Sequence, residues 1–309
     1  MANSKFDFNK SLIKVLILYA AIFIVGIIIA CVFGVKLDIN FRGGTRLTYS
    51  YSGEVEEGDI KEIVKENVEG TFSVSKSTSL AGDTNTFTIS LAGNKSLSAE
   101  TQTAITTALQ EKYADGEIEI YDSNSVSPTI AGTFLLKSFV AVILTAILVV
   151  IYVGIRFKKI GGISAALTAL CALVLDLLVT FFVCVIFRLQ IDSNYIAVVL
   201  TILGYSLNDT IVVYDRVREN RRQNSEMVIG DIVNMSITKV LVRNIVTTIT
   251  TVLAVITIIV VSEIYGLTSL RTFAIPMAFG LLSGCFSSVF VAGPLWVKWK
   301  EYKANKAKA

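Results

Sequence analysis

Histidine is absent from this 309-residue sequence, and cysteine, proline and charge are scarce. The lack of histidine excludes a histidine-based proton relay or catalytic base within the chain. All four cysteines (Cys31, Cys171, Cys184 and Cys285) fall inside apolar runs and match no metal-site spacing, so we expect them to be packing residues. Charged residues make up 17% of the chain against 53% hydrophobic residues, and the mean hydropathy is +0.65. This composition excludes an ordinary soluble protein.

Long apolar runs dominate what is present. Six are long enough to cross a bilayer, which needs about 20 residues each. Their expected bounds are 12–35, 133–155, 163–187, 193–214, 240–261 and 270–297. The first run lacks a small-residue cleavage site, so we expect a retained helix. The sequence therefore predicts a tail at 1–11, a first membrane helix, an inserted domain at 36–132, a five-helix bundle at 133–297 and a basic tail at 298–309.

The distribution of lysine and arginine predicts the orientation. Sixteen of them, counting Lys14 next to the first tail, lie in the two tails and in the loops near Arg156 and between Asp215 and Lys239. The short loops of the opposite set hold two, Arg188 and Arg271. Cytoplasmic loops carry the excess of positive charge, whereas long inserts translocate regardless of charge. We therefore expect both termini in the cytoplasm and the acidic insert outside.

The insert has the pattern of a small α+β domain. Gly43 and Gly44 end the first helical stretch and Thr45 opens a strand, so these residues form the turn into the domain. The order β-α-β-β-α-β favours a small sheet with both helices on one face. No catalytic constellation is present, which favours a binding or scaffolding domain over an enzyme. The expected strands are Thr45–Tyr51, Thr71–Thr78, Thr86–Leu91 and Glu117–Tyr121, and the expected helices are Glu56–Val68 and Ser98–Tyr113.

One acid interrupts the fourth apolar run. Asp209 precedes the charged cluster that opens at Asp215 by six residues, which places it roughly 9 Å inside the apolar zone. A carboxylate there is costly, so an acid within a membrane helix indicates a functional site. Polar neighbours on the fourth and fifth runs indicate a hydrated path; they are Ser206, Asn208, Thr210, Asn234, Asn244, Thr247 and Thr248.

The fifth run supplies a basic counterpart. Arg243 follows Lys239 by four residues, or ~6 Å of depth, so an antiparallel hairpin places Arg243 and Asp209 at a similar level. Two interpretations follow: a fixed ion pair that locks the two helices, or an acid that exchanges protons and pairs with Arg243 in only one state. The second is favoured because a fixed buried pair adds little stability. One charge crossing the membrane field is worth about 2.3 kcal/mol per 100 mV, enough to drive work when several protons pass.

Two further features mark the membrane part. Asp176, near the middle of the third run, is either a second proton-carrying acid or a carboxyl kept neutral by a hydrogen bond to a neighbouring helix. Gly280 and Gly284 in the sixth run let helices approach closely, and we expect the same of Gly204 in the fourth. Pro276 predicts a kink in the sixth run.

Three segments resemble the SecD/SecF family of bacterial protein-export membrane proteins, within the RND superfamily. The resemblance covers nearly the whole chain. It implies an α-helical membrane protein of the RND half-transporter type, with six transmembrane helices and a small α+β extracytoplasmic domain between helices 1 and 2. At matching positions it implies proton coupling for Asp209, Arg243 and Asp176. The segments are GYSLNDTIVVYDRVREN at 204–220, NMSITKVLVRNIVTTITT at 234–251 and, more weakly, INFRGGT at 39–45.

The resemblance also implies partners and a location. The expected partners are SecD, the SecYEG channel with YidC- or YajC-type accessory subunits, membrane lipid and an unfolded polypeptide in transit. No nucleic acid, cofactor or metal is expected. The location is the bacterial plasma membrane, where the family is thought to couple the proton-motive force to late steps of polypeptide translocation. Two positions depart from the family pattern: Leu175 replaces the usual His before Asp176, and Asn40 replaces the usual Asp, with Asp38 nearby.

Two other functions compete with this one. An RND-like, proton-driven exporter of small solutes or lipids is the first alternative, and the small size of the insert counts against it. A passive adaptor, in which Asp209 and Arg243 only lock two helices, is the second.

Overall fold

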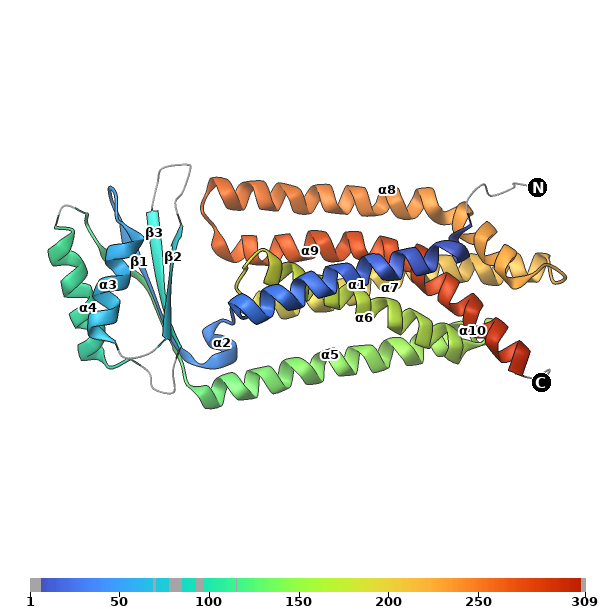
Figure 1. Cartoon of the computed structure of the whole chain (residues 1–309), viewed down its shortest axis with the longest axis horizontal. Coiled ribbons are helices and arrows are strands. Elements are labelled where there is room, and N and C mark those ends of the chain that lie inside the picture. Colours follow the sequence, from blue (N-terminus) through green and yellow to red (C-terminus); the bar gives the residue numbers. More distant parts are fainter. Residues whose placement is uncertain (1–6, 69–70, 78–84, 93–96, 115, 307–309) are drawn as a thin grey trace.

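The computed structural model describes residues 7–68, 71–77, 85–92, 97–114 and 116–306. The molecule is elongated, with a helical bundle at one end and a small sheet domain at the other (Figure 1). Within the described residues, six helical segments are long and apolar enough to cross a membrane. They are α1 (Phe8–Phe33), α5 (Pro128–Arg156), α6 (Gly162–Ile186), α7 (Ser193–Gln223), α8 (Ile229–Ile264) and the combined α9–α10 segment.

The helices α7 and α8 run further than the apolar pattern predicts. We expected a cytoplasmic segment from Asp215 to Lys239, but α7 continues to Gln223 and α8 begins at Ile229. Most of that segment is therefore a helical hairpin closed by a turn of a few residues. Charged residues do not end a helix, because Arg, Glu and Lys are good helix formers and the backbone bonds are internal. Hydropathy reports where lipid ends, and the helix continues past that point.

The last span is built in three pieces. It consists of α9 (Thr268–Ser287), a π-helical turn (Ser288–Ala292) and α10 (Gly293–Lys306). Pro276, where we expected a kink, lies inside α9, which is assigned as one helix from Thr268 to Ser287. The change of direction lies instead at the π-helical turn, beyond which α10 leaves the line of α9 (Figure 1). Such turns are a known cause of sharp bends in helices.

The domain between α1 and α5 is a four-stranded antiparallel sheet with strand order β2-β3-β1-β4. Its element order is the predicted β-α-β-β-α-β, preceded by a short helix, α2 (Ile39–Arg42), that the sequence reading missed. The predicted turn at 82–83 and the outermost residues of both tails lie outside the described residues. The elements are β1 (Gly44–Tyr51), α3 (Glu57–Asn67), β2 (Thr71–Ser77), β3 (Asn85–Ala92), α4 (Ala99–Lys112) and β4 (Glu119–Val126).

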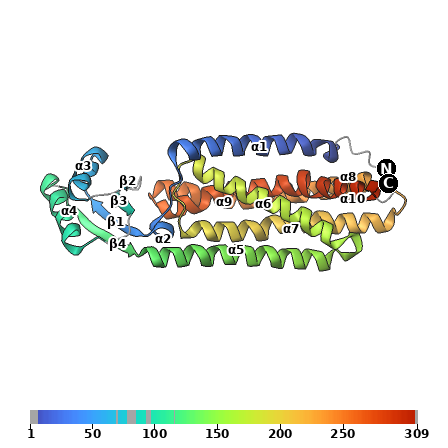
Figure 2. The same ribbon diagram turned by 60° about the horizontal axis from the view of Figure 1, so that its bottom comes forward.

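The two faces of this sheet differ in chemistry. One face packs Leu47, Tyr49, Phe87 and Ile89 against α3 and α4, with all four side chains fully buried. The opposite face is polar: from β2 to β4, the strand register aligns Ser73, Ser90, Arg46 and Asn124 in one row and Ser75, Thr88, Thr48 and Asp122 in the next. The helices cover the side turned away from the bundle, so the polar face is turned toward the bundle (Figures 1 and 2).

The membrane bundle is most buried at its centre. Helix α6 touches α1, α5, α7 and α9, and more than half of its most apolar window is buried. By contrast, α1, α5 and α8 expose many large apolar side chains. Exposed apolar surface on this scale suits contact with lipid or with another membrane protein.

Candidate functional site

Asp209 lies near the middle of α7 and is almost fully buried, with 2% of its surface exposed. One carboxyl oxygen, Oδ2, has no hydrogen-bond partner in the described part of the chain. Buried polar groups are satisfied in the great majority of cases, so an exception calls for an explanation. Because no protein group bonds to this oxygen, the oxygen is available to bind a proton.

Arg243 does not pair with Asp209 in this structure. Among the described residues, neither side chain has an ion-pair partner within 4.0 Å, and Arg243 faces outward from α8. The two are nevertheless close enough to interact electrostatically. The hairpin argument gives a matching depth, but depth does not fix the rotation of α8. The rotation turns Arg243 toward the outside of the chain.

The buried face of α8 holds two more polar groups without a hydrogen-bond partner among the described residues. They are the Nδ2 atom of Asn244 and the hydroxyl of Thr248, which lie one turn apart on the buried face of α8. One turn further on, the Tyr205 hydroxyl of α7 donates to Thr251 at 3.2 Å. Asp209 thus faces a helix whose buried side presents hydroxyl and amide groups instead of an apolar seal.

The outer face of the same hairpin carries a few polar residues among exposed apolar ones. Asn208 and Gly204 on α7, and Arg243 and Thr247 on α8, are all exposed. The hydroxyl of Thr247 donates to the Arg243 carbonyl at 2.7 Å, which satisfies it within its own helix. We expected Gly204 to pack against a neighbouring helix, but a Cβ there would meet nothing within 4 Å. Within this chain Gly204 therefore has no close-packing role.

Asp176 lies in different surroundings. It is fully buried on α6, and serine hydroxyls from two other helices donate to its carboxylate. Ser206 of α7 donates to Oδ2 at 2.6 Å, and Ser283 and Ser287 of α9 donate to Oδ1 and Oδ2 at 2.6 and 2.7 Å. The carboxyl group thus joins α6, α7 and α9. Sequence reading found the acid but not its partners, although Ser283 and Ser287 share one helix face.

Two glycines of α9 make this arrangement compact. A Cβ on Gly284 would lie 2.9 Å from the Cβ of Ser206. A Cβ on Gly280 would lie 2.1 Å from Cδ1 of Ile202 and 2.8 Å from the hydroxyl of Thr180. The α9 backbone therefore reaches α7 and α6 at positions where only glycine fits. The close approach brings the α9 serines within reach of Asp176.

The remaining predicted polar residues lie beside Asp176 or at the end of the bundle. Thr210 contacts Ser288 at 2.9 Å, and Ser288 also donates to the Ser206 carbonyl at 3.3 Å, which ties α7 to the π-helical turn. Asn234 lies away from the site: it donates to Asp7 and accepts from the Phe8 amide at the start of α1. Asn234 therefore fixes a terminus and takes no part in a path near Asp209.

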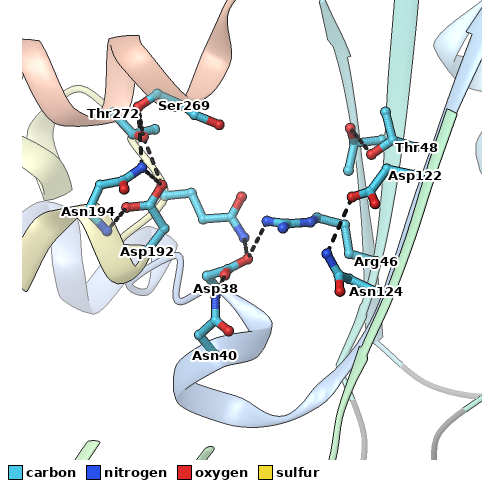
Figure 3. A network of polar contacts seen from close by, with 12 residues as sticks. Asp38, Asn40, Arg46, Thr48, Asp122, Asn124, Asp192, Asn194, Ser269 and Thr272 are labelled. Atoms are coloured by element: carbon cyan, nitrogen blue, oxygen red, sulfur yellow. Dashed lines mark hydrogen bonds and ion pairs between the residues drawn. The ribbon is translucent and has the colours of Figure 1, made fainter. Parts of the chain in front are cut away.

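The turn into the sheet domain forms a second polar site at the opposite end of the bundle (Figure 3). Asp38 is fully buried there and accepts hydrogen bonds from Asn40, Arg46 and Gln190. Asn40 is the position where the family's acid is missing, and its amide donates to Asp38 at 2.6 Å. Asp38 thus supplies the negative charge of this turn.

Backbone conformation and lack of space explain why the turn contains glycines. Gly43 has φ +78°, and a Cβ there would lie 2.9 Å from the Cα of Pro128. Gly44 has φ +134° and pairs with Val126 across the sheet. The hydroxyl of Thr45, the next residue, contacts that of Ser125 at 3.2 Å. The two chain segments that connect the domain to the bundle therefore run side by side.

Asp192 extends this second site toward the start of α7. Its carboxylate accepts from the amides of Asn194 and Tyr195, which caps α7, and from the Thr272 hydroxyl of α9 at 2.9 Å. Burial raises the pKa of Asp192, as does the nearby charge of Asp38. Within the described residues, no group of three or more His, Cys, Asp and Glu side chains could hold a metal ion.

Sequence comparison connects this architecture to known proteins. Residues 104–302 match the family described as Protein export membrane protein SecD/SecF, C-terminal. The protein translocase subunit SecDF of Bacillus subtilis is 33% identical over 99% of this chain and 40% of its own length. The protein translocase subunit SecF of Alicyclobacillus acidocaldarius is 28% identical over 98% of this chain and 96% of its own.

Solved structures agree. The crystal structure of SecDF from Thermus thermophilus, described as a translocon-associated membrane protein, superposes with a TM-score of 0.80 at 25% identity over 97% of this chain. A SecDF structure in a super-membrane-facing form superposes with a TM-score of 0.62 at 25% identity over 98% of this chain. This chain covers 40% of each.

Fold and site thus define a six-helix membrane protein with a small sheet domain after its first helix and two acids buried in its bundle. The chain belongs to the SecD/SecF family of protein-export membrane proteins. The chain spans nearly the whole length of the SecF relative and 40% of the SecDF relatives.

Proposed function

We propose that this subunit couples the proton-motive force to a late step of polypeptide translocation, with Asp209 as the group that takes up and releases the proton. The observation that carries the proposal is the buried Asp209 oxygen without a protein partner, next to an arginine that does not pair with it. A carboxyl group fixed in a salt bridge would resist protonation, whereas this one is open to it.

Arg243 supplies the alternation that such a cycle needs. It is close enough to act on Asp209 electrostatically, yet no ion pair forms in this state. Rotation of α8 or movement of α7 would bring the two together, and pairing would favour the ionised acid. The polar side chains of Asn244 and Thr248 lie along the same interface and suit a hydrated route for the proton.

The exposed polar residues on α7 and α8 support a partner protein with a similar helical bundle. Arg243 lies four residues after Lys239, or ~6 Å inside the apolar part of α8. An arginine exposed to lipid at that depth is costly, so another protein surface is expected to cover it. We propose SecD as that partner, because the SecDF relatives carry this chain as 40% of one longer polypeptide.

The wider assembly is proposed on the family relation. In this proposal the chain and SecD lie beside the SecYEG channel, with YidC- or YajC-type subunits as further neighbours and an unfolded polypeptide in transit. Both termini face the cytoplasm of a bacterial plasma membrane in this proposal, and the sheet domain is extracytoplasmic. The positive-inside distribution of Lys and Arg supports that orientation.

Substitution of Asp209 tests the proton role. Asp209→Asn removes the exchangeable proton with little change of shape, and we expect export to lose its stimulation by the proton gradient. At 100 mV one charge represents about 2.3 kcal/mol, which is roughly a 50-fold bias. The measurement is gradient-dependent export in inverted membrane vesicles that contain the complete translocase. Glu263→Gln is the matched control, because Glu263 is a half-exposed acid at the far end of α8 that pairs with Arg271. Gradient-dependent export that survives in Asp209→Asn and in Arg243→Met contradicts the proposal and favours the passive adaptor.

Co-purification tests the partner. We expect the chain to be recovered from native membranes with SecD, and Arg243→Met together with Asn208→Leu to weaken that recovery. The control is Arg222→Met, which removes an exposed charge from α7 beyond the membrane. Recovery with a different class of exporter and without SecD would overturn the assignment.

A further inference from the structure

The sheet domain is attached to the bundle at one narrow place. Gly43 approaches the backbone of Pro128 so closely that a Cβ would not fit, and the neighbouring Gly44 pairs with Val126. Both covalent connections therefore pass through one point. The larger contacts of the sheet with the rest of the chain run through the short helix α2. A domain held this way is free to tilt unless non-covalent contacts fix its angle.

The turn before α2 is firmly part of the bundle. The Asp38 amide donates to the Ile191 carbonyl at 3.0 Å, and the Ile191 amide donates to the Lys36 carbonyl at 2.8 Å, which forms a parallel bridge with the α6–α7 loop. Phe41 of α2 packs its ring against Phe134 of α5. Backbone and apolar contacts together thus make 36–42 an extension of the outer ends of α5, α6 and α7.

One polar contact reaches from this turn to the sheet. Arg46 extends from the polar face of β1 and its Nη1 atom lies 3.3 Å from Oδ1 of Asp38. The same oxygen accepts from Gln190 of the α6–α7 loop at 3.0 Å, and Asn40 satisfies Oδ2. The Asp38 side chain is fully buried, while that of Arg46 is 30% exposed. Figure 3 shows Arg46 reaching from the sheet to Asp38, with Asn40 beside Asp38 on the other side.

We propose that the Asp38 carboxylate is a positioning group that fixes the angle of the sheet domain on the bundle, by receiving Arg46 from the sheet and Gln190 from the bundle at one oxygen. The proposal goes beyond proton coupling, and it stands whether or not Asp209 exchanges protons. Gln190 holds the Asp38 oxygen in place on the bundle, so the bond from Arg46 meets an acceptor of fixed position. A single exposed ion pair would contribute little. Here the acid is desolvated, so loss of either donor leaves a buried charge that is poorly compensated.

A second acid, at the start of α7, lies near this contact. Asp192 lies two residues after Gln190, caps α7 and accepts from Thr272 of α9. Its charge acts on Asp38 from the bundle side, where Arg46 supplies the opposing positive charge. The Asp38 site therefore lies near the outer ends of α7 and α9, the helices whose serines donate to Asp176.

Distance measurement between spin labels tests the proposal on the full-length chain in lipid nanodiscs. Labels at Lys65→Cys on α3 and Tyr265→Cys at the end of α8 report the tilt, with the four native cysteines replaced by alanine. We expect one narrow distance peak for the parent chain and loss of that peak in Asp38→Asn and in Arg46→Met. The double variant should be no broader than either single variant, because both remove one interaction.

Matched controls separate this tie from general loosening. Arg42→Met removes an exposed arginine of α2, and Asp122→Asn removes an exposed acid on the same sheet face; both should keep the narrow peak. Arg46→Lys retains the charge and should restore much of it. Where Asp38→Asn fails to fold, Arg46→Met remains usable because its side chain is partly exposed. An unchanged peak in Arg46→Met, or equal broadening in Arg42→Met, would overturn the proposal.

Discussion

The two acids in the bundle lie in opposite surroundings, although both are nearly inaccessible. Asp176 receives three serine hydroxyls from α7 and α9 at 2.6–2.7 Å. Asp209 has one carboxyl oxygen with no hydrogen-bond partner among the described residues, and the neighbouring Asn208 and Arg243 are exposed on the outside of the α7–α8 hairpin. A carboxyl group with all its bonds made resists change, whereas one with bonds missing can gain from a proton or from a moving arginine. We therefore propose a static role for the Asp176 site between α6 and α9 and a mobile one for the Asp209 site between α7 and α8.

The largest expected contrast is in gradient-driven export. We expect Asp176→Asn to keep most of the stimulation that Asp209→Asn loses, because an asparagine oxygen in the place of Oδ2 can still accept from Ser206 and Ser287. The assay is the vesicle export measurement described for Asp209, with equal amounts of each variant in the membrane. If Asp176→Asn abolishes the stimulation while its unfolding temperature is unchanged, Asp176 is a proton carrier and the division of roles is wrong.

Stability should show the reverse order. Asp176→Leu removes three hydrogen bonds between helices, each worth about 0.6 kcal/mol in a membrane, so we expect a loss of about 2 kcal/mol. Asp209→Leu removes a carboxyl group that is not fully bonded and should be neutral or stabilising for the isolated chain. Reversible unfolding of the purified chain in mixed detergent, followed by the fluorescence of Trp296 and Trp299, compares the two. Equal losses would show that Asp209 is held more firmly than its contacts indicate.

The close approach of α9 provides a smaller perturbation. Gly284→Ala forces a new methyl group against Ser206, so we expect a weaker Ser206–Asp176 bond and a stability loss of about 1–2 kcal/mol. Gly204→Ala is the matched control on the open side and should leave the stability of the chain unchanged. Gly204→Leu extends the test, since it should reduce recovery of the partner without affecting unfolding. Loss of stability in Gly204→Ala would mean that the α7 face is not open.

The smallest effect concerns an acid outside the membrane. The Tyr113 hydroxyl donates to Asp59 at 2.7 Å, and this bond, helped by Lys112, lowers the pKa of Asp59 below its usual 3.8. An acid with a depressed pKa contributes stability above its unfolded pKa and loses it as the pH falls through the folded value. Asp59→Asn should therefore slightly destabilise the sheet domain at pH 6 and make no difference well below pH 3.8. Urea unfolding followed by tyrosine circular dichroism measures both; a larger difference at the lower pH would reverse the sign and contradict the assignment.

The sequence predicts the elements better than their rotations. Hydropathy places six spans and alternation places four strands, because burial in lipid and in a sheet leaves a periodic record in the chain. Depth along a hairpin also follows from counting residues. The direction in which Arg243 points does not, since the long helices α7 and α8 are rotated by contacts with α9 that no local pattern reveals.

Contacts between distant segments account for what sequence reading missed. The donors to Asp176 come from 30 to 111 residues away, and Gln190 is 152 residues from Asp38. The acid at Asp38 was noted beside the missing family acid at position 40, but its burial was not foreseen. The spacing of Ser283 and Ser287, one turn apart beside Gly284, is the signal in the sequence that could have indicated a polar face toward Asp176.

The contact between Gly43 and Pro128 has a consequence for how such chains can diversify. A segment whose two ends touch can be exchanged for any domain with adjacent ends, and the helices on either side need not change. The bundle therefore offers one attachment point that can accept different inserted domains. A graft of a foreign sheet domain between Gly43 and Pro128 would keep the bundle intact, and it would keep its fixed angle only if it brought its own arginine for Asp38.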